Sequence, residues 1–168
     1  LSDIFWTIGL VQDLETSSIR NPSFNTFIAA QIYFNERSLL SNSSKVTDLI
    51  SVMGDVHHIF PREYLKQNGI DDKSQYNQVA NYAYLDTGVN ISIGKKAPNE
   101  YFSIALEQCS SGEAKIGTII DKDKLYLNLH ENCIPEKIFN MDHQDYPEFL
   151  RLRREMMANK IHEYYDTL

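Results

Sequence analysis

The sequence has no apolar run close to the roughly 20 residues that a membrane-spanning helix requires. Its N-terminus also lacks a basic segment followed by an apolar stretch and a small-residue cleavage site, which is the pattern of a secretory signal. These two absences exclude an integral membrane protein and give secretion no support. We therefore expect a cytoplasmic protein with no membrane partner.

Cysteine is scarce as well. Only Cys109 and Cys133 are present, and neither lies in a CxxC pair. Two cysteines cannot build a four-cysteine zinc site or a disulfide framework. We expect buried free thiols in a reducing compartment, because free cysteine usually packs as a small hydrophobic side chain.

Positive charge is in deficit, with 16 Lys and Arg against 23 Asp and Glu and a net charge of −7. This balance argues against a protein that coats nucleic acid through a broad basic surface, but a local basic patch remains compatible with it. The 168 residues are 42% hydrophobic, enough for one domain with a core. The chain begins with Leu1, and we expect it to be a fragment of a longer protein.

Hydrophobic spacing predicts a mostly helical chain with a small β element in its middle. Ile4, Ile8, Val11 and Leu14 have the spacing of one helix face. Asp145 and Glu148 have capping-box spacing ahead of a last helix. Further helices are expected from Asn21-Pro22 towards Arg37, over 44–50, over 61–69 and from Pro98 to near Gly112. Strands are expected over 118–120 and 125–127, a strand or a helix end that runs into one over 76–85, and a compact polar turn region over 87–96.

The stretch that carries chemistry is Asp55-Val56-His57-His58-Ile59-Phe60-Pro61. Side chains alternate along an extended segment, so adjacent histidines point to opposite sides. A backbone bend there would let one imidazole bind a metal while its neighbour faces a substrate. Two histidines that only pack against aromatic residues are the simpler alternative.

Two later asparagines give this stretch a context. Asn81 in ANYAYL and Asn90 in VNISIGKK follow HHIFP in an order that resembles the HNH nuclease motif of the ββα-metal fold. From Lys45 to Phe102 the sequence looks like the C-terminal HNH domain of GmrSD-type restriction enzymes, and YPEFLxxRR and HEYYDTL fit the helix that closes such domains. The chain departs from many HNH domains in lacking their two CxxC pairs, so helices must support the site.

The resemblance implies an α+β fold, mainly α-helical, with the ββα-metal (HNH) motif embedded in surrounding helices. Residues 1–44 are then a helical N-terminal extension or the end of a linker region. Residues 45–168 are then the HNH nuclease domain with its C-terminal helix. An N-terminal ParB-like NTPase domain of the same polypeptide, DNA as substrate and a role in phage or foreign-DNA defence are further implications, and an oligomer stays open.

The resemblance also implies a role for individual residues. His58 matches the general base that activates a water, and Asn81 matches the residue that orients this base. His57 and Asn90 match metal ligands, for Mg²⁺ or Mn²⁺ in the cell and for Zn²⁺ or Ni²⁺ as ions that crystals would trap. Asp55 is a third ligand, a hydrogen-bond partner of His57 or a turn residue. The basic residues expected to contact the DNA backbone are Lys95, Lys96, Arg62 and Lys66.

Two rival functions remain open from the sequence. One is an HNH-fold module that binds DNA or a protein without cleaving, and the other is a structural or regulatory domain whose histidines only pack. The role of the basic residues on the last helix is also open. They either contact DNA or form ion pairs with acidic neighbours at helical spacing. These basic residues are Arg151, Arg153, Arg154 and Lys160, and the acidic ones are Glu148, Glu155 and Glu163.

Overall fold

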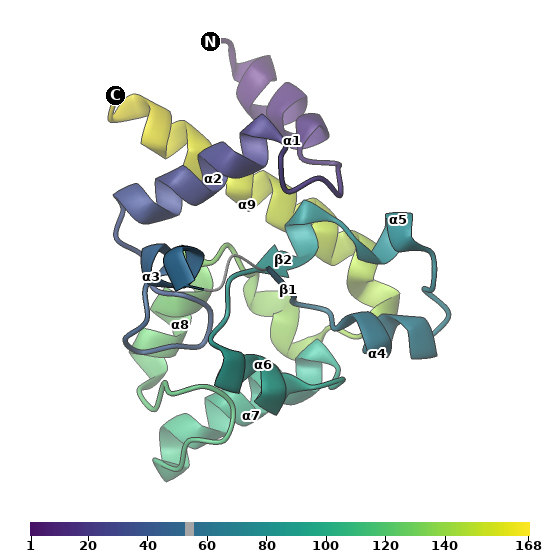
Figure 1. The fold of residues 1–168 in the computed structure, drawn as a ribbon, viewed down its shortest axis with the longest axis vertical. Helices are drawn as coiled ribbons and strands as arrows, with labels where there is room; N and C mark the ends of the chain where they lie inside the picture. Colours follow the sequence, from purple (N-terminus) through teal and green to yellow (C-terminus); the bar gives the residue numbers. More distant parts are fainter. Residues whose placement is uncertain (53–55) are drawn as a thin grey trace.

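The computed structural model describes residues 1–52 and 56–168 and has a mainly helical α+β fold with a two-stranded antiparallel sheet (Figure 1). The predicted mainly helical α+β class is therefore confirmed. The strands are β1 (His57–His58) and β2 (Tyr82–Ala83). The helices are η1 (Phe5–Gly9), α1 (Leu10–Asp13), α2 (Pro22–Tyr33), α3 (Val46–Val52), α4 (Arg62–Gln67), α5 (Lys73–Tyr76), η2 (Val79–Asn81), α6 (Thr87–Ile93), α7 (Pro98–Ser111), α8 (Lys122–Glu131), η3 (Glu136–Asn140), η4 (His143–Asp145) and α9 (Tyr146–Asp166).

Helix α9 is the long element on which the other parts assemble. It contacts η1, α1 and α2 towards one end of the molecule and η2 and η4 further along its length (Figure 1). Its buried positions include Phe149, Leu150, Met157 and Ile161, so one apolar face forms the back of the core. No helix in the described part of the chain is long and apolar enough to cross a membrane.

Helices whose ends carry local signals form where the sequence predicts them. The Asn21 side chain accepts a hydrogen bond of 3.0 Å from the Phe24 N–H, which caps α2 behind Pro22. Helix α7 begins at Pro98 and ends at Gly112, whose φ of 74° is left-handed backbone that favours glycine. The helices expected over 44–50 and 61–69 are confirmed as α3 and α4.

The strands expected over 118–120 and 125–127 are wrong. The Asp121 side chain accepts from the Lys124 N–H at 3.0 Å and so caps helix α8 instead of closing a β turn. Leu125 and Leu129, one helical turn apart, are both buried. Over 76–85 the second alternative is the one observed, because the end of α5 and then η2 lead into the short strand β2. The region 87–96, expected as a turn region, contains α6.

The expected capping box is wrong by one turn. Asp142 and Asp145 form it at the start of η4, and Asp145 then precedes α9 without a side-chain cap of its own. The expected face of the first helix is also wrong at Ile4 and Ile8, which are 70% and 51% exposed. Trp6 is buried there instead, because its ring stacks on His162 of α9 with centroids 4.0 Å apart.

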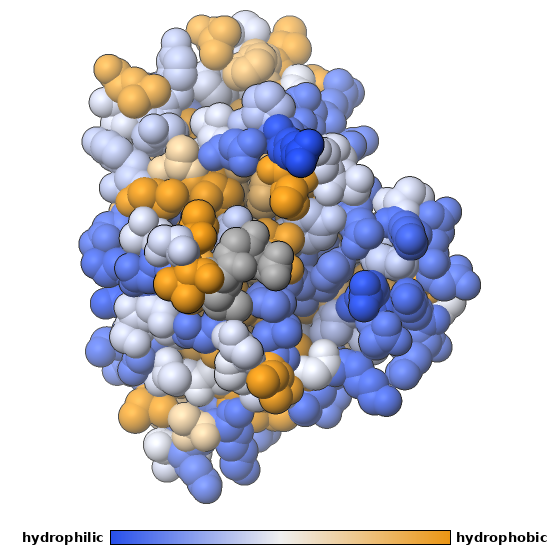
Figure 2. Space-filling model, in the orientation of Figure 1, coloured by the Kyte–Doolittle hydropathy of each residue, from blue (hydrophilic) through white to orange (hydrophobic). Residues whose placement is uncertain are grey.

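Apolar surface and polar surface are unevenly distributed. Figure 2 shows apolar side chains at the surface over the N-terminal helices and α2, whereas the lobe that carries α4 and α5 is mostly hydrophilic.

Cys133 is buried and Cys109 half-buried, both as free thiols. Burial raises the pKa of the Cys133 thiol to about 11, so this cysteine is an unreactive core residue.

Two of the four basic residues expected on one side of the last helix are buried instead of exposed. Arg153 is 1% exposed and donates to the carbonyl oxygens of Ala80, Tyr82 and Asn132. Lys160 is also buried and pairs with Glu36. Arg151 pairs with Glu148 and Glu155, and Arg154 donates to Gln78. At Arg151 the ion-pair alternative is therefore the one observed.

Candidate functional site

The short sheet fixes the paired histidines. His57 lies opposite Ala83 and His58 opposite Tyr82 in an antiparallel register. The pairing continues through the Ile59 N–H, which donates to the Asn81 carbonyl at 2.8 Å. Helix α6 follows β2 after a short connection, so the described backbone has the order strand, strand, helix. Helices α4 and α5 are inserted between the two strands (Figure 1).

Asn81 is fully buried behind this sheet. Its amide oxygen accepts from the Phe60 N–H at 2.8 Å, and its amide nitrogen donates to the Phe60 carbonyl at 3.1 Å. The same amide nitrogen also donates to the Tyr76 carbonyl oxygen, at 3.3 Å. Asn81 therefore holds the backbone two residues after His58.

One groove of about 600 Å³ lies over the histidine strand. It brings together residues that are far apart in the sequence, from β1, the start of α4 and the end of α6. Five of the predicted site residues line it, while the other lining residues were not predicted. The lining residues are Val56, His57, His58, Pro61, Arg62, Glu63, Asn90, Gly94 and Lys95.

Among the described residues, three predicted site residues do not line this groove: Asn81, which is buried behind the sheet, Lys96 and Lys66. Lys96 donates to the Ser92 carbonyl at 2.9 Å and so satisfies the end of α6. The Lys66 ammonium lies 3.8 Å from the Glu63 carboxylate and above the ring of Tyr76. Asp55 lies outside the described residues.

The His58 side chain has a hydrogen-bond partner that lies outside the HNH-like motif. Its Nε2 is 2.9 Å from the amide oxygen of Asn77, the residue that ends α5. Its ring also contacts the rings of Tyr82 and Tyr76, with centroids 5.4 and 6.3 Å away. Nothing in the spacing of Asn77 relative to HHIFP identifies it, because α4 and its loop separate the two in sequence.

The surroundings of His58 act on its pKa in opposite directions. Burial lowers the pKa of the imidazole, and the hydrogen bond to Asn77 opposes this by favouring the protonated ring. The nearby charges of Arg62 and His57 lower the pKa further. The net shift of the His58 pKa is downward, which favours the neutral imidazole.

The donor atoms in the groove can be compared with the needs of a divalent ion. His57 brings an imidazole and Asn90 an amide oxygen, and both line the groove. Among residues 1–52 and 56–168, no group of three His, Cys, Asp or Glu side chains is arranged to hold a metal. Two neutral donors fit an ion that keeps several waters, such as Mn²⁺ or Mg²⁺, and do not fit a closed structural zinc site.

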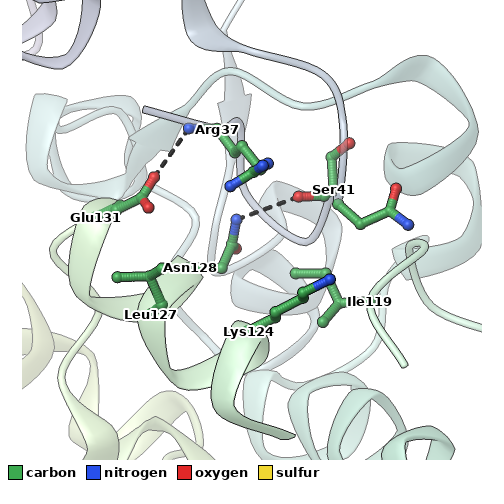
Figure 3. Close-up of a pocket in the computed structure, with 8 residues that line it drawn as sticks. Arg37, Ser41, Ile119, Lys124, Leu127, Asn128 and Glu131 are labelled. Atoms are coloured by element: carbon green, nitrogen blue, oxygen red, sulfur yellow. Dashed lines mark hydrogen bonds between the residues drawn. The ribbon is translucent and has the colours of Figure 1, made fainter. Parts of the chain in front are cut away.

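Another pocket lies between α8 and the segment around Arg37 and Ser41 (Figure 3). The Arg37 N–H donates to Glu131 and the Asn128 amide donates to Ser41 there. Its volume is about 20 Å³, which is room for about one water molecule and not for a substrate.

The groove over β1 is therefore the candidate site, since it combines paired histidines, an amide and two basic side chains in a space of useful size. No protein-family model, curated protein or solved structure significantly matches this chain.

Proposed function

We propose that this chain is a metal-dependent HNH endonuclease domain that nicks or cleaves DNA. The observation that carries the proposal is the groove itself. The order strand, strand, helix brings His57, His58 and Asn90 to one surface, beside Arg62 and Lys95. These are the residues to which the resemblance assigns base, metal-binding and phosphate-binding roles.

The proposed reaction needs a base that is neutral at the working pH. Imidazole has an ordinary pKa of about 6.5 and is the commonest side chain for this task. His58 lines the groove and would take a proton from the water that attacks the phosphorus. Asn81 fixes the adjacent backbone at Phe60, so the histidine does not need to be ordered when DNA binds.

The remaining groove residues would bind the DNA phosphates and a divalent ion. Arg62 and Lys95 lie on different walls of the groove, one at the start of α4 and one after α6, and would contact phosphates on either side of the cleaved bond. His57 and Asn90 would hold a divalent ion, Mg²⁺ or Mn²⁺, which supplies charge stabilisation at the phosphate and at the leaving 3′ oxygen.

The proposal extends to the biological setting. A chain that resembles the C-terminal domain of GmrSD-type enzymes is suited to restriction of phage or other foreign DNA in the cytoplasm. An upstream ParB-like NTPase domain in the same polypeptide would then decide which DNA reaches the groove.

A plasmid assay tests the proposal. Supercoiled plasmid is incubated with the chain in Mg²⁺, in Mn²⁺ or in EDTA, alongside the His58→Ala variant. His130→Ala is the matched control, because His130 is an exposed histidine on α8, away from the groove. We expect nicked circles from the parent and from His130→Ala, loss of nicking in EDTA, and a decrease of about 100-fold or more for His58→Ala.

Three results would contradict the proposal. They are absence of nicking in every metal, nicking that persists in EDTA, and a His58→Ala variant as active as the parent. DNA that shifts in a gel without being cut would favour the binding-module alternative.

A further inference from the structure

Asn77 lies at a well-anchored point of the chain. Its own N–H donates to the Lys73 carbonyl at 3.0 Å, which closes the single turn of α5. Two residues later the Val79 N–H donates to the Thr16 carbonyl at 2.8 Å. The backbone is thus held on both sides of Asn77, so its side chain has a defined starting point from which to reach another element.

That side chain reaches the histidine strand. The amide oxygen of Asn77 lies 2.9 Å from His58 Nε2, across 19 residues of sequence. Tyr76 and Tyr82 contact the same imidazole ring, and both tyrosines are buried. The two aromatic rings and the directional hydrogen bond together constrain the orientation of the imidazole.

The hydrogen bond also decides where the imidazole carries its proton. A carboxamide oxygen is only an acceptor, so Nε2 must be the protonated nitrogen of neutral His58. The lone pair is then on Nδ1. His58 lines the groove, so a fixed ring with a basic Nδ1 is prepared to accept a proton from a bound water.

We propose that Asn77 is a positioning residue for His58, which selects its Nε2–H tautomer and fixes its ring so that Nδ1 is the catalytic base. The inference rests on the proposed nuclease function. An amide suits this place better than a carboxylate, because it orients the ring without adding negative charge next to a groove meant for phosphate.

The first test needs no enzymatic activity. Nitrogen-15 correlation spectra of the histidine rings, recorded on the metal-free protein at about pH 8, report which ring nitrogen carries the proton. His58→Ala identifies the His58 signals by their loss. We expect the Nε2–H tautomer in the parent and in Asn77→Asp, and a mixture of tautomers in Asn77→Ala.

Gln78→Ala is the matched control for this measurement. Gln78 is the next residue, and its amide contacts Ser74 and Arg154 instead of the histidine. We expect it to retain the parent tautomer. An Nδ1–H tautomer in the parent, or an unchanged tautomer in Asn77→Ala, would overturn the inference.

The second test is the rate of plasmid nicking. Removing a residue that orients a catalytic group typically costs 10- to 100-fold in activity. We expect Asn77→Ala to lower kcat by about this factor with KM changed less than about twofold, and Asn77→Asp to recover most of the loss. A loss in Asn77→Ala no larger than in Gln78→Ala would overturn the positioning role.

The two tests separate the two proposals. If the parent never nicks plasmid, the proposed function fails, and the tautomer spectra still decide whether Asn77 orients His58. If the parent nicks and the spectra show the Nδ1–H tautomer, only the role of Asn77 fails. Thermal unfolding of each variant, within about 4 °C of the parent, shows that the fold is retained.

Discussion

Two basic side chains of α9 and two of the groove are the same residue types in opposite environments. Arg153 and Lys160 are buried and bonded to carbonyl or carboxylate oxygens of the chain itself. Arg62 and Lys95 are exposed at the groove, and the Arg62 side chain is 55% accessible. The buried cations therefore bond to oxygens of the chain and stabilise the fold. The exposed cations of the groove can instead bind a ligand.

Buried Arg153 also holds the strand next to the groove. The Arg153 guanidinium donates to the carbonyl oxygens of Ala80 and Tyr82, at 2.9 and 2.6 Å, on the segment that becomes β2. Strand β2 pairs with the histidine strand. Burial lowers the pKa of Arg153 to about 10, which keeps it charged at neutral pH. A residue of the last helix thus holds the candidate site from behind.

The largest expected effect comes from removing Arg153. Arg153→Met keeps an apolar stem in place of the first part of the side chain and leaves the buried carbonyl oxygens of Ala80, Tyr82 and Asn132 without their donor. We expect a loss of about 4 kcal/mol or more in the free energy of unfolding, measured by urea denaturation. A loss below about 1 kcal/mol would show that the buried and exposed arginines do not differ as argued.

The Glu36–Lys160 pair should show the next largest effect. Lys160→Met leaves the Glu36 carboxylate buried without its partner, and we expect a loss of about 3 kcal/mol. The Glu36→Gln, Lys160→Met double variant should recover part of this, because no charge then remains buried. Simple additivity of the two single losses would contradict this account.

The pH dependence of this loss has a definite sign. Burial raises the pKa of Glu36 to about 7, with Glu131 and Glu163 acting in the same direction and Lys160 against it. A carboxyl group with a raised pKa binds its proton more readily in the folded state, so folding is favoured as the pH falls towards about 4.5. The Lys160→Met loss should therefore be larger at pH 8 than at pH 5.

Asn81→Ala should have a smaller effect on stability and a visible one on function. It removes the hydrogen bonds to both backbone groups of buried Phe60, and we expect a loss of about 2 kcal/mol. Nicking by the folded variant should fall as well, because the backbone after His58 loses its support. Full nicking activity together with this destabilisation would make Asn81 a purely structural residue.

The smallest effects on stability are expected in the groove. Arg62→Ala and Lys95→Ala should change the free energy of unfolding by no more than about 0.5 kcal/mol. Each should lower the slope of log binding constant against log salt for DNA by about 1. Arg151→Ala removes the same charge from a surface ion pair, and it should leave that slope unchanged.

Local signals in the sequence account for much of the fold and part of the site. Asn21-Pro22 and the interval from Pro98 to Gly112 predict helices that are present, because their caps bond within a few residues. The order HHIFP, Asn81 and Asn90 led to five of the groove residues. Asn77 could not be predicted, since its partner His58 belongs to another element.

The errors have two physical origins, one local and one long-range. Leu125-Tyr126-Leu127 has β propensity, but the Asp121 cap and the burial of Leu125 and Leu129 favour a helix. Ile4 and Ile8 have helical spacing, yet Trp6 is buried in their place because it stacks on His162. The Asp121 cap is a local signal, three residues from Lys124, that can be mistaken for a turn, whereas the Trp6–His162 contact joins residues distant in sequence.

The sequence by itself determined the mainly helical class, the capped ends of α2 and α7, and the order of the paired histidines and the two asparagines. Only the tertiary structure decided that Arg153 supports β2 from inside the core, that Asn77 contacts His58, and that Arg62 and Lys95 share a groove. Caps and periodicity act over a few residues, whereas burial and long-range hydrogen bonds depend on which elements pack together.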